Sequence, residues 1–293
     1  MNHTPDVVEV FAAKFPLLTR FAPIGFWILA VAVIATAVKF FVMGGEPGQD
    51  SHAYWLAAQS TDPYGRPPGT RDAFLYSPFF LMLIRPLTWL PWPVFCALWV
   101  LIGAAIIYWL VRPLKWQWAV PIGISGLLDL VVGNIWVFLA LVAVIGLRHP
   151  WAFAWAALTK VTTGVGLVWF AARGEWKRFS IGAGTVAAIV GIGFLIDGDT
   201  WRAWIGFLIT NQGNTPDPSW SFVLRCLASV ALVVMAARKN WPALIPVAMC
   251  LATPVLFTLV PWTPLLAVPR LLKATPAKAP ASAPSSAGSA PRA

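Results

Sequence analysis

Residues 48–57 read Gly-Gln-Asp-Ser-His-Ala-Tyr-Trp-Leu-Ala and place one carboxylate beside an imidazole and two amphipathic aromatic rings. They follow an apolar run at 22–44, which is interrupted only by Lys39 and is long enough to cross a bilayer once. Because Trp and Tyr favour the headgroup level of a membrane, Asp50 is expected at the membrane surface. There it could take a proton from a substrate that is itself partly lipid. The alternative interpretation is an ordinary solvated acid in a loop.

Charged side chains inside apolar runs are costly, and each is a candidate for function. Asp129 and Lys160 lie within such runs, Arg85 precedes Pro86, and Arg225 lies near the start of a later run. For Asp129 the alternatives are a functional role or a buried ion pair with Lys160 or Arg85. For Lys160 they are a contact with a lipid phosphate, or snorkelling and ion pairing.

The composition indicates the class of protein. Of the 293 residues, 59% are hydrophobic and 11% are charged, whereas a soluble domain carries about a quarter charged residues. The sequence therefore predicts an all-α, polytopic transmembrane helical bundle with membrane lipids around it. The net charge of +10 comes from short basic clusters between apolar runs and in the tail. This is the positive-inside pattern, so we predict no binding to nucleic acid.

The chain divides into three parts. We predict a cytoplasmic N-terminus at 1–21, a transmembrane domain at 22–272, and a disordered basic tail rich in Ala, Pro and Ser at 273–293. The loop at 45–73 carries four acids against two arginines and is expected outside the cytoplasm. Within it, residues 50–59 could form a short helix lying on the surface.

The remaining apolar runs do not give a unique crossing count. In the arrangement we favour, residues 74–90 dip and return without crossing, and 150–172 is a pair of short helices broken near Lys160. If both segments cross simply, Arg112 and Arg148 lie outside. Both versions place the loop at 197–219 outside, with Asp197-Gly198-Asp199 as a turn within it. The other runs are 93–112, 116–132, 134–147, 179–196, 220–237 and 242–272, the last being two segments that meet near Trp262.

Familiar cofactor and nucleotide motifs are missing from the sequence. The three cysteines (Cys96, Cys226 and Cys250) lie singly in apolar runs, without the spacing of metal or redox sites. We find no phosphate-binding glycine loop, no zinc-protease helix and no serine-nucleophile elbow. The sequence therefore predicts no metal and no cofactor, and a substrate that carries its own activation.

The order of short motifs resembles glycosyltransferase family 87, the polyprenol-phosphate-mannose-dependent mannosyltransferases of the GT-C superfamily. The resemblance spans residues 20–272. Where the family usually has Gly-Gln, and a Pro after the lysine, this chain has Gly133-Asn134 and Val161. The motifs that carry it are Asp50-Ser-His-Ala-Tyr54, Asp62-Pro-Tyr64, Phe74-Leu-Tyr76-Ser-Pro78, Gly133-Asn134, the helix ending at Lys160, Arg173–Arg178, Asn211-Gln212 before Arg225, and Ala252-Thr-Pro254 with Trp262.

The resemblance implies a GT-C-like bundle whose first extracytoplasmic loop carries the active site. A polyprenyl-phosphate sugar would be the donor and a lipid or glycan the acceptor, in the plasma membrane of a bacterium. Asp50 would be the catalytic base, and the sugar, most simply mannose, would be transferred with inversion. Because the donor already holds a good leaving group, the other need is cations for the departing phosphate. Lys160 and Arg225 are the candidates.

The predicted substrate-binding residues extend beyond these two cations. His52 and Tyr54 would orient the acceptor or simply line the loop. The full predicted set is His52, Tyr54, Tyr76, Asn134, Lys160 and Arg225.

Two other classes of protein stay open at this point. A secondary transporter or lipid flippase would use Asp129, Lys160 and Arg85 as a pathway at the membrane midplane. Against it, the sequence lacks repeated halves and its polar residues concentrate on the predicted outer side. The third alternative is a degenerate membrane subunit that keeps the scaffold without turnover.

Overall fold

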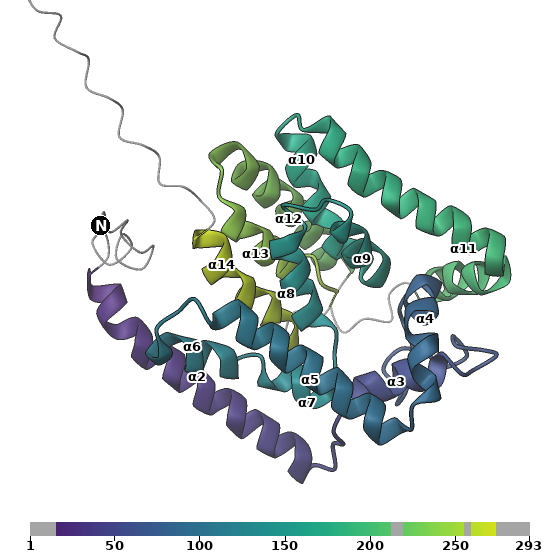
Figure 1. Ribbon diagram of the computed structural model, residues 1–293, viewed down its shortest axis with the longest axis horizontal. Coiled ribbons are helices and arrows are strands. Elements are labelled where there is room, and N and C mark those ends of the chain that lie inside the picture. The colour runs from purple at the N-terminus through teal and green to yellow at the C-terminus, as the bar shows by residue number, and fades with distance from the viewer. Residues whose placement is uncertain (1–15, 212–218, 255–258, 274–293) are drawn as a thin grey trace, which may run out of the picture.

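The computed structural model describes residues 16–211, 219–254 and 259–273, and every regular element within these ranges is a helix (Figure 1). The prediction of an all-α protein is confirmed. Most of the predicted N-terminal part and nearly all of the predicted tail (1–15 and 274–293) lie outside the described residues.

Four of the described helices are long and apolar enough to cross a membrane. They contain the candidate spans Phe21–Val42, Trp92–Val111, Trp176–Thr210 and Trp220–Lys239. A helix of 20 residues is about 30 Å long, the thickness of a hydrocarbon core. The chain is therefore a helical membrane protein.

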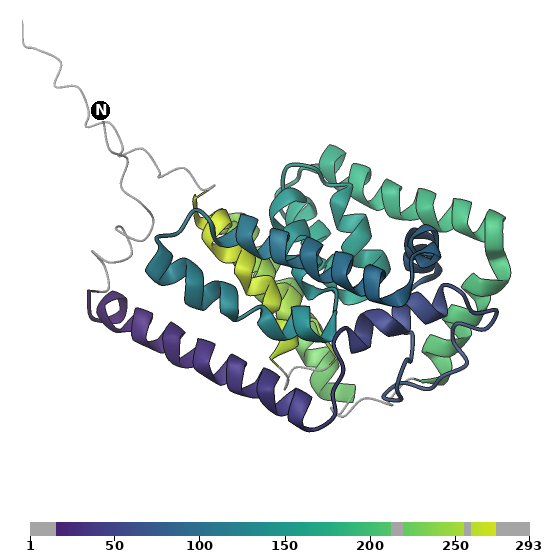
Figure 2. The ribbon, with the colours of Figure 1, turned by 60° about the horizontal axis from the view of Figure 1, so that its bottom comes forward.

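The first long helix, α2 (Pro16–Val42), lies along one side of the bundle against α6 (Trp116–Ile124) and α7 (Leu127–Val132) (Figure 2). Large apolar side chains such as Ile28 and Val31 remain exposed on it. Such a surface is costly in water, whereas lipid tails cover it at no cost. The exposed face of α2 is therefore suited to contact with lipid. Within the predicted apolar run at 22–44, the helix continues up to Val42.

Helix α3 (Gln49–Ala57) follows the first long helix. It confirms the predicted short helix, but one face of it is buried against α4 (Pro78–Ile84) and α5 (Trp92–Val111). The buried residues include the small Ser51, Ala53 and Ala57, which let neighbouring helices approach closely. Helix α3 is therefore part of the packed bundle as well as part of the loop.

Several predicted apolar runs are divided into shorter helices. The run at 74–90 becomes α4 and the 3₁₀ helix η1 (Arg85–Trp89), and a seven-residue helix such as α4 is only about 10 Å long. The run at 116–132 breaks at Ser125 and Gly126 between α6 and α7. The next run forms α8 (Trp136–Ile145), which lies in the middle of the bundle (Figure 1) and buries Leu139, Ala140 and Ala143 completely.

The predicted break near Lys160 is confirmed. Helix α9 (Ala152–Thr159) ends at this residue, which has an extended backbone, and η2 (Val161–Leu167) and α10 (Val168–Ala172) follow. Thr159 and Thr163 both donate side-chain hydrogen bonds to carbonyl groups beside this break, and two of these carbonyls, of Ala156 and Lys160, also accept backbone N–H groups.

The predicted loop at 197–219 is wrong in its first part. Helix α11 (Trp176–Thr210) continues through it with a kink at Asp197, whose backbone is not helical. The carboxylate of Asp197 accepts hydrogen bonds from the Thr200 backbone N–H and hydroxyl groups, at 3.2 and 2.8 Å. Asp197 thus caps a second helical segment, and the Asp-Gly-Asp triplet is a capped kink and not a turn in a loop. Figure 1 shows this second segment turning back toward α4.

The last predicted run also divides at a different place. Helices η3 (Pro242–Leu244) and α13 (Ile245–Leu251) precede the break, and η4 (Val260–Ala267) and α14 (Val268–Lys273) follow it. Trp262 lies within η4, so the two segments do not meet there. Helix α12 (Ser219–Lys239) packs against α13, and η4 packs against α8.

Candidate active site

Two glycines bring the start of α3 against the turn between α7 and α8. Gly48 and Gly133 both have left-handed backbones, with φ of 72° and 73°, a conformation that favours glycine. The Gly48 N–H donates a hydrogen bond to the Val131 carbonyl at 2.8 Å. A Cβ on Gly133 would lie 2.4 Å from Ser51 Oγ and 3.0 Å from Gly48 Cα. Only a residue without a side chain permits this approach.

The approach places Asn134 beside Asp50. Asn134 Nδ2 donates a hydrogen bond to Asp50 Oδ2 at 2.5 Å, while Asn134 Oδ1 accepts one from the Ile135 N–H at 2.7 Å. Since the amide oxygen is engaged by a backbone donor, the amide nitrogen is the atom that faces the carboxylate.

The environment of Asp50 alters its acidity. Burial raises the pKa of the Asp50 carboxyl above its usual range, and the Asn134 hydrogen bond and the charge of Lys160 offset part of this effect. The Asp50 side chain is therefore a stronger base than a solvated aspartate.

Lys160 lies at the break after α9, near the same carboxylate. Its Nζ lies 4.4 Å from the centre of the Trp136 ring and 5.1 Å from that of Tyr76. Among the residues that the structure describes, no acceptor or carboxylate lies within bonding distance of Nζ. Two aromatic faces thus hold an ammonium group whose hydrogen-bond donors are available to an anion.

Asp129 has a backbone partner, so the alternative of a buried ion pair with Lys160 or Arg85 is wrong. Its side chain is 1% exposed, and Oδ2 accepts a hydrogen bond from the Val137 N–H in the first turn of α8, at 2.8 Å. This is the favourable position for a carboxylate at a helix N-terminus. Neither Lys160 nor the exposed Arg85 forms an ion pair with it. Within the described ranges, Oδ1 has no hydrogen-bond partner.

Tyr54 and Tyr76 connect α3 to the segment before α4. Their hydroxyl oxygens are 3.1 Å apart, both side chains are buried, and the Tyr64 hydroxyl donates to the Tyr76 carbonyl at 2.9 Å. The Ser77 hydroxyl donates to the Leu158 carbonyl near the end of α9, which brings Tyr76 to Lys160. The rings of Phe74, Phe80 and Trp99 surround Tyr54.

His52 and Arg225 have other partners. His52 Nδ1 lies 2.7 Å from Asp72 Oδ1, and its ring contacts Trp92 at a centroid distance of 4.7 Å. Arg225 donates to Ser221 Oγ and to the carbonyls of Thr253 and Pro254, which ties α12 to the chain after α13. We find no hydrogen bond or ion pair from either residue to Asp50 or Lys160 among the described residues.

The structure thus brings together five of the predicted site residues. Sequence reasoning included Tyr64 and Ser77 in its motifs without giving them a positioning role, and it missed Trp136, which gave no local signal. The role of Ser77 could have been suspected from its place before Pro78, a usual start of a helix. The five residues that come together are Asp50, Tyr54, Tyr76, Asn134 and Lys160.

These features define a helical membrane protein with a carboxylate and an ammonium group in one polar site. The family model of glycosyltransferase family 87 matches residues 74–279, which is most of the chain. The chain belongs to this family and is a membrane glycosyltransferase. Tyr76, Asn134, Lys160 and Arg225 lie within the matched segment, whereas Asp50, His52 and Tyr54 precede it. No curated protein and no solved structure matches the chain.

Proposed function

We propose that the protein transfers a mannosyl group from a polyprenyl-phosphate donor to the hydroxyl of a lipid or glycan acceptor, on the extracytoplasmic side of a bacterial plasma membrane. Asp50 takes the proton of the attacking hydroxyl, the bond from that oxygen to the anomeric carbon forms, and the bond from the anomeric carbon to the phosphate oxygen breaks. Attack from the face opposite the phosphate inverts the anomeric centre. The polyprenyl phosphate leaves with the bonding electrons.

The observation that carries this proposal is that Asp50 and Lys160 lie in one site, close enough for each charge to influence the other. The carboxylate is hydrogen-bonded to Asn134 on one side and lies within the electrostatic reach of Lys160 on the other. A base and a cation in one site are the two groups that an activated phosphate donor requires. An ammonium group that has no acceptor among the described residues is suited to a phosphate oxygen.

The roles of the other residues follow from their contacts. Tyr76 and Trp136 hold the Lys160 side chain in place through their ring faces, and Asn134 orients the Asp50 carboxylate. Tyr54 supports Tyr76 from α3. Arg225 is proposed as a second phosphate contact on the resemblance alone.

A direct test mixes purified protein with radiolabelled polyprenyl-phosphate mannose, membrane lipids and mannose oligosaccharides. The proposal predicts labelled product when the donor is polyprenyl-phosphate mannose. Polyprenyl-phosphate glucose at the same concentration should give much less product. Movement of label between leaflets without transfer would instead indicate a flippase, and neither transfer nor movement would indicate a degenerate subunit.

A further inference from the structure

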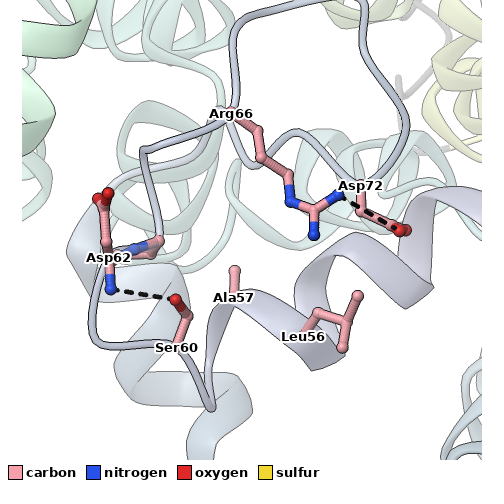
Figure 3. A pocket seen from close by; sticks show the side chains of 7 residues that line it. Leu56, Ala57, Ser60, Asp62, Arg66 and Asp72 are labelled. Carbon is pink, nitrogen blue, oxygen red and sulfur yellow. Dashed lines mark hydrogen bonds and ion pairs between the residues drawn. The ribbon is translucent and has the colours of Figure 1, made fainter.

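A second polar feature lies at the other end of α3. The C-terminal turn of this helix and the loop after it border an open hollow of about 210 Å³ (Figure 3). Its lining combines the apolar Leu56 and Ala57 with the charged Asp62, Arg66 and Asp72. Drug-sized ligands occupy pockets of about 300–1,000 Å³, so this hollow fits a smaller group.

The charged groups in the hollow keep hydrogen-bonding capacity. Arg66 Nη1 lies 3.9 Å from Asp72 Oδ2, a separation that leaves the two groups open to a shared polar partner. Arg66 has five N–H donors, and within the described ranges only Nη1 donates, to the Arg71 carbonyl at 3.2 Å. The Asp62 backbone N–H bonds to Ser60 Oγ at 3.0 Å, while we find no donor to the Asp62 carboxylate among the described residues.

The loop geometry fixes these groups. Asp62 Oδ2 lies against Gly65, where a Cβ would come within 2.4 Å. Asp72 has a left-handed backbone with φ of 60°, which is unusual for a residue other than glycine, and the hydrogen bond between its Oδ1 and His52 Nδ1 ties it to α3. His52 therefore holds one wall of the hollow.

The lining favours a neutral polyol over an anion. Two carboxylates and one guanidinium leave the hollow with a net negative charge, so a phosphate would be repelled overall. A sugar ring offers paired hydroxyl groups that both donate and accept, and an apolar face of C–H groups. The carboxylate and guanidinium groups can bind the hydroxyl groups of the sugar, and Leu56 and Ala57 can cover its apolar face.

We propose that this hollow is an acceptor subsite that binds a sugar ring of a glycan acceptor, away from the ring that receives the new sugar. The inference rests on the proposed function and adds to it that the acceptor is a glycan. Asp50 and Ala57 lie at opposite ends of α3, about 10 Å apart along the helix. A glycan longer than one sugar could therefore present its attacking hydroxyl at Asp50 while an adjoining ring lies in the hollow.

The test compares variants of the hollow with a matched control. Arg66→Ala and Asp62→Asn each remove charged hydrogen bonds to the acceptor, so each should raise the KM for mannotriose about 10-fold or more. The KM for the donor should stay within twofold. Glu46→Gln is the control, because Glu46 is an exposed acid that does not line the hollow and pairs with the side chain of Arg71, whose backbone carbonyl is the group that Arg66 uses. Thermal unfolding checks that each variant is folded.

Calorimetric titration of mannotriose into the purified protein gives a second readout that does not depend on transfer. Weaker binding to both hollow variants than to Glu46→Gln supports the subsite. Equal binding to all of them, or transfer to a lipid acceptor without sugar that is as efficient as transfer to mannotriose, would overturn it while leaving the proposed function intact. Absence of transfer in the unaltered protein would overturn the proposed function, whereas the titration would still report on the hollow.

Discussion

Asn134 and Asp50 are 84 positions apart in the sequence, yet their side chains are joined by a hydrogen bond of 2.5 Å. The bond connects the turn between α7 and α8 to the start of α3, where Gly133 and Gly48 make the close approach sterically feasible. It also fixes the carboxylate in the neighbourhood of Lys160. The proposed base therefore has a fixed position relative to the proposed phosphate contact.

The pH dependence of transfer should reflect this contact. A base acts in its ionised form, so kcat/KM should fall as the pH drops through the pKa of Asp50, which burial raises above the usual range. Asn134→Ala removes a hydrogen bond that lowers this pKa, so the acidic limb of the profile should move to higher pH.

The control is Gln59→Ala, which removes an exposed amide two residues after the end of α3. It should leave the limb in place. A limb that stays unmoved, or moves to lower pH, in Asn134→Ala would separate Asn134 from the titrating group.

Lys160→Met should impair use of the donor. The substitution keeps most of the stem against Trp136 and Tyr76 and removes the charge. Losing one charged contact to a phosphate in a site of low dielectric should cost about 2–4 kcal/mol, or roughly 30- to 1,000-fold in kcat/KM for the donor. Lys177→Met, at an exposed position in the first turn of α11, is the matched control. Normal turnover per folded molecule of Lys160→Met would make Lys160 a structural residue.

Gly133→Ala should destabilise the protein and reduce transfer together. A left-handed backbone costs about 1–3 kcal/mol for a residue with a side chain, and the new Cβ would also collide with Ser51 Oγ. Gly44→Ala pays only the first cost, because its φ is 86° and nothing lies within 4 Å of the added atom. The unfolding temperature measured in detergent should therefore be lower for Gly133→Ala than for Gly44→Ala. Adding Ser51→Gly to Gly133→Ala should restore part of the loss, and no recovery would argue against the close approach.

The proposed orientation of the chain predicts which residues face the cell exterior. In a background without Cys96, Cys226 and Cys250, a cysteine at exposed Thr61 should react with a membrane-impermeant thiol reagent in intact cells. A cysteine at exposed Lys177 should not react until the cells are opened. If only the Lys177→Cys variant is labelled in intact cells, the proposed orientation is wrong and Asp50 lies on the cytoplasmic side.

Composition and hydropathy were sufficient to predict the helical membrane fold, because long apolar runs favour lipid over water and a helix pairs backbone N–H and C=O groups where no water is present. The helix break at Lys160 was also predictable, since a lysine between threonines and glycines interrupts an otherwise apolar run. The continuation of α11 past Asp197 was not, because Asp-Gly-Asp is typical of turns and only the Thr200 contacts identify a cap.

The sequence predicted which residues belong to the site better than it predicted their contacts. Asp50, Asn134 and Lys160 are unusual side chains next to apolar runs, and that chemistry is visible in the sequence. The pairing of His52 with Asp72, and of Tyr54 with Tyr76, depends on a loop of about twenty residues whose path no local pattern specifies. The burial of Tyr54 illustrates the limit, because a tyrosine suits both an interface and an aromatic core.

The most direct test of the account is the rate of sugar transfer by Asp50→Asn. The amide keeps the shape of the side chain and cannot take up the acceptor proton, so the rate should fall by roughly 10²- to 10⁴-fold. Thermal unfolding should change little, because burial already disfavours the charged form of Asp50. Donor binding should persist, since the phosphate contacts do not involve the acceptor proton, and Glu46→Gln should transfer sugar at the normal rate. Near-normal transfer by Asp50→Asn, or an equal loss in Glu46→Gln, would contradict the role of Asp50 as the base.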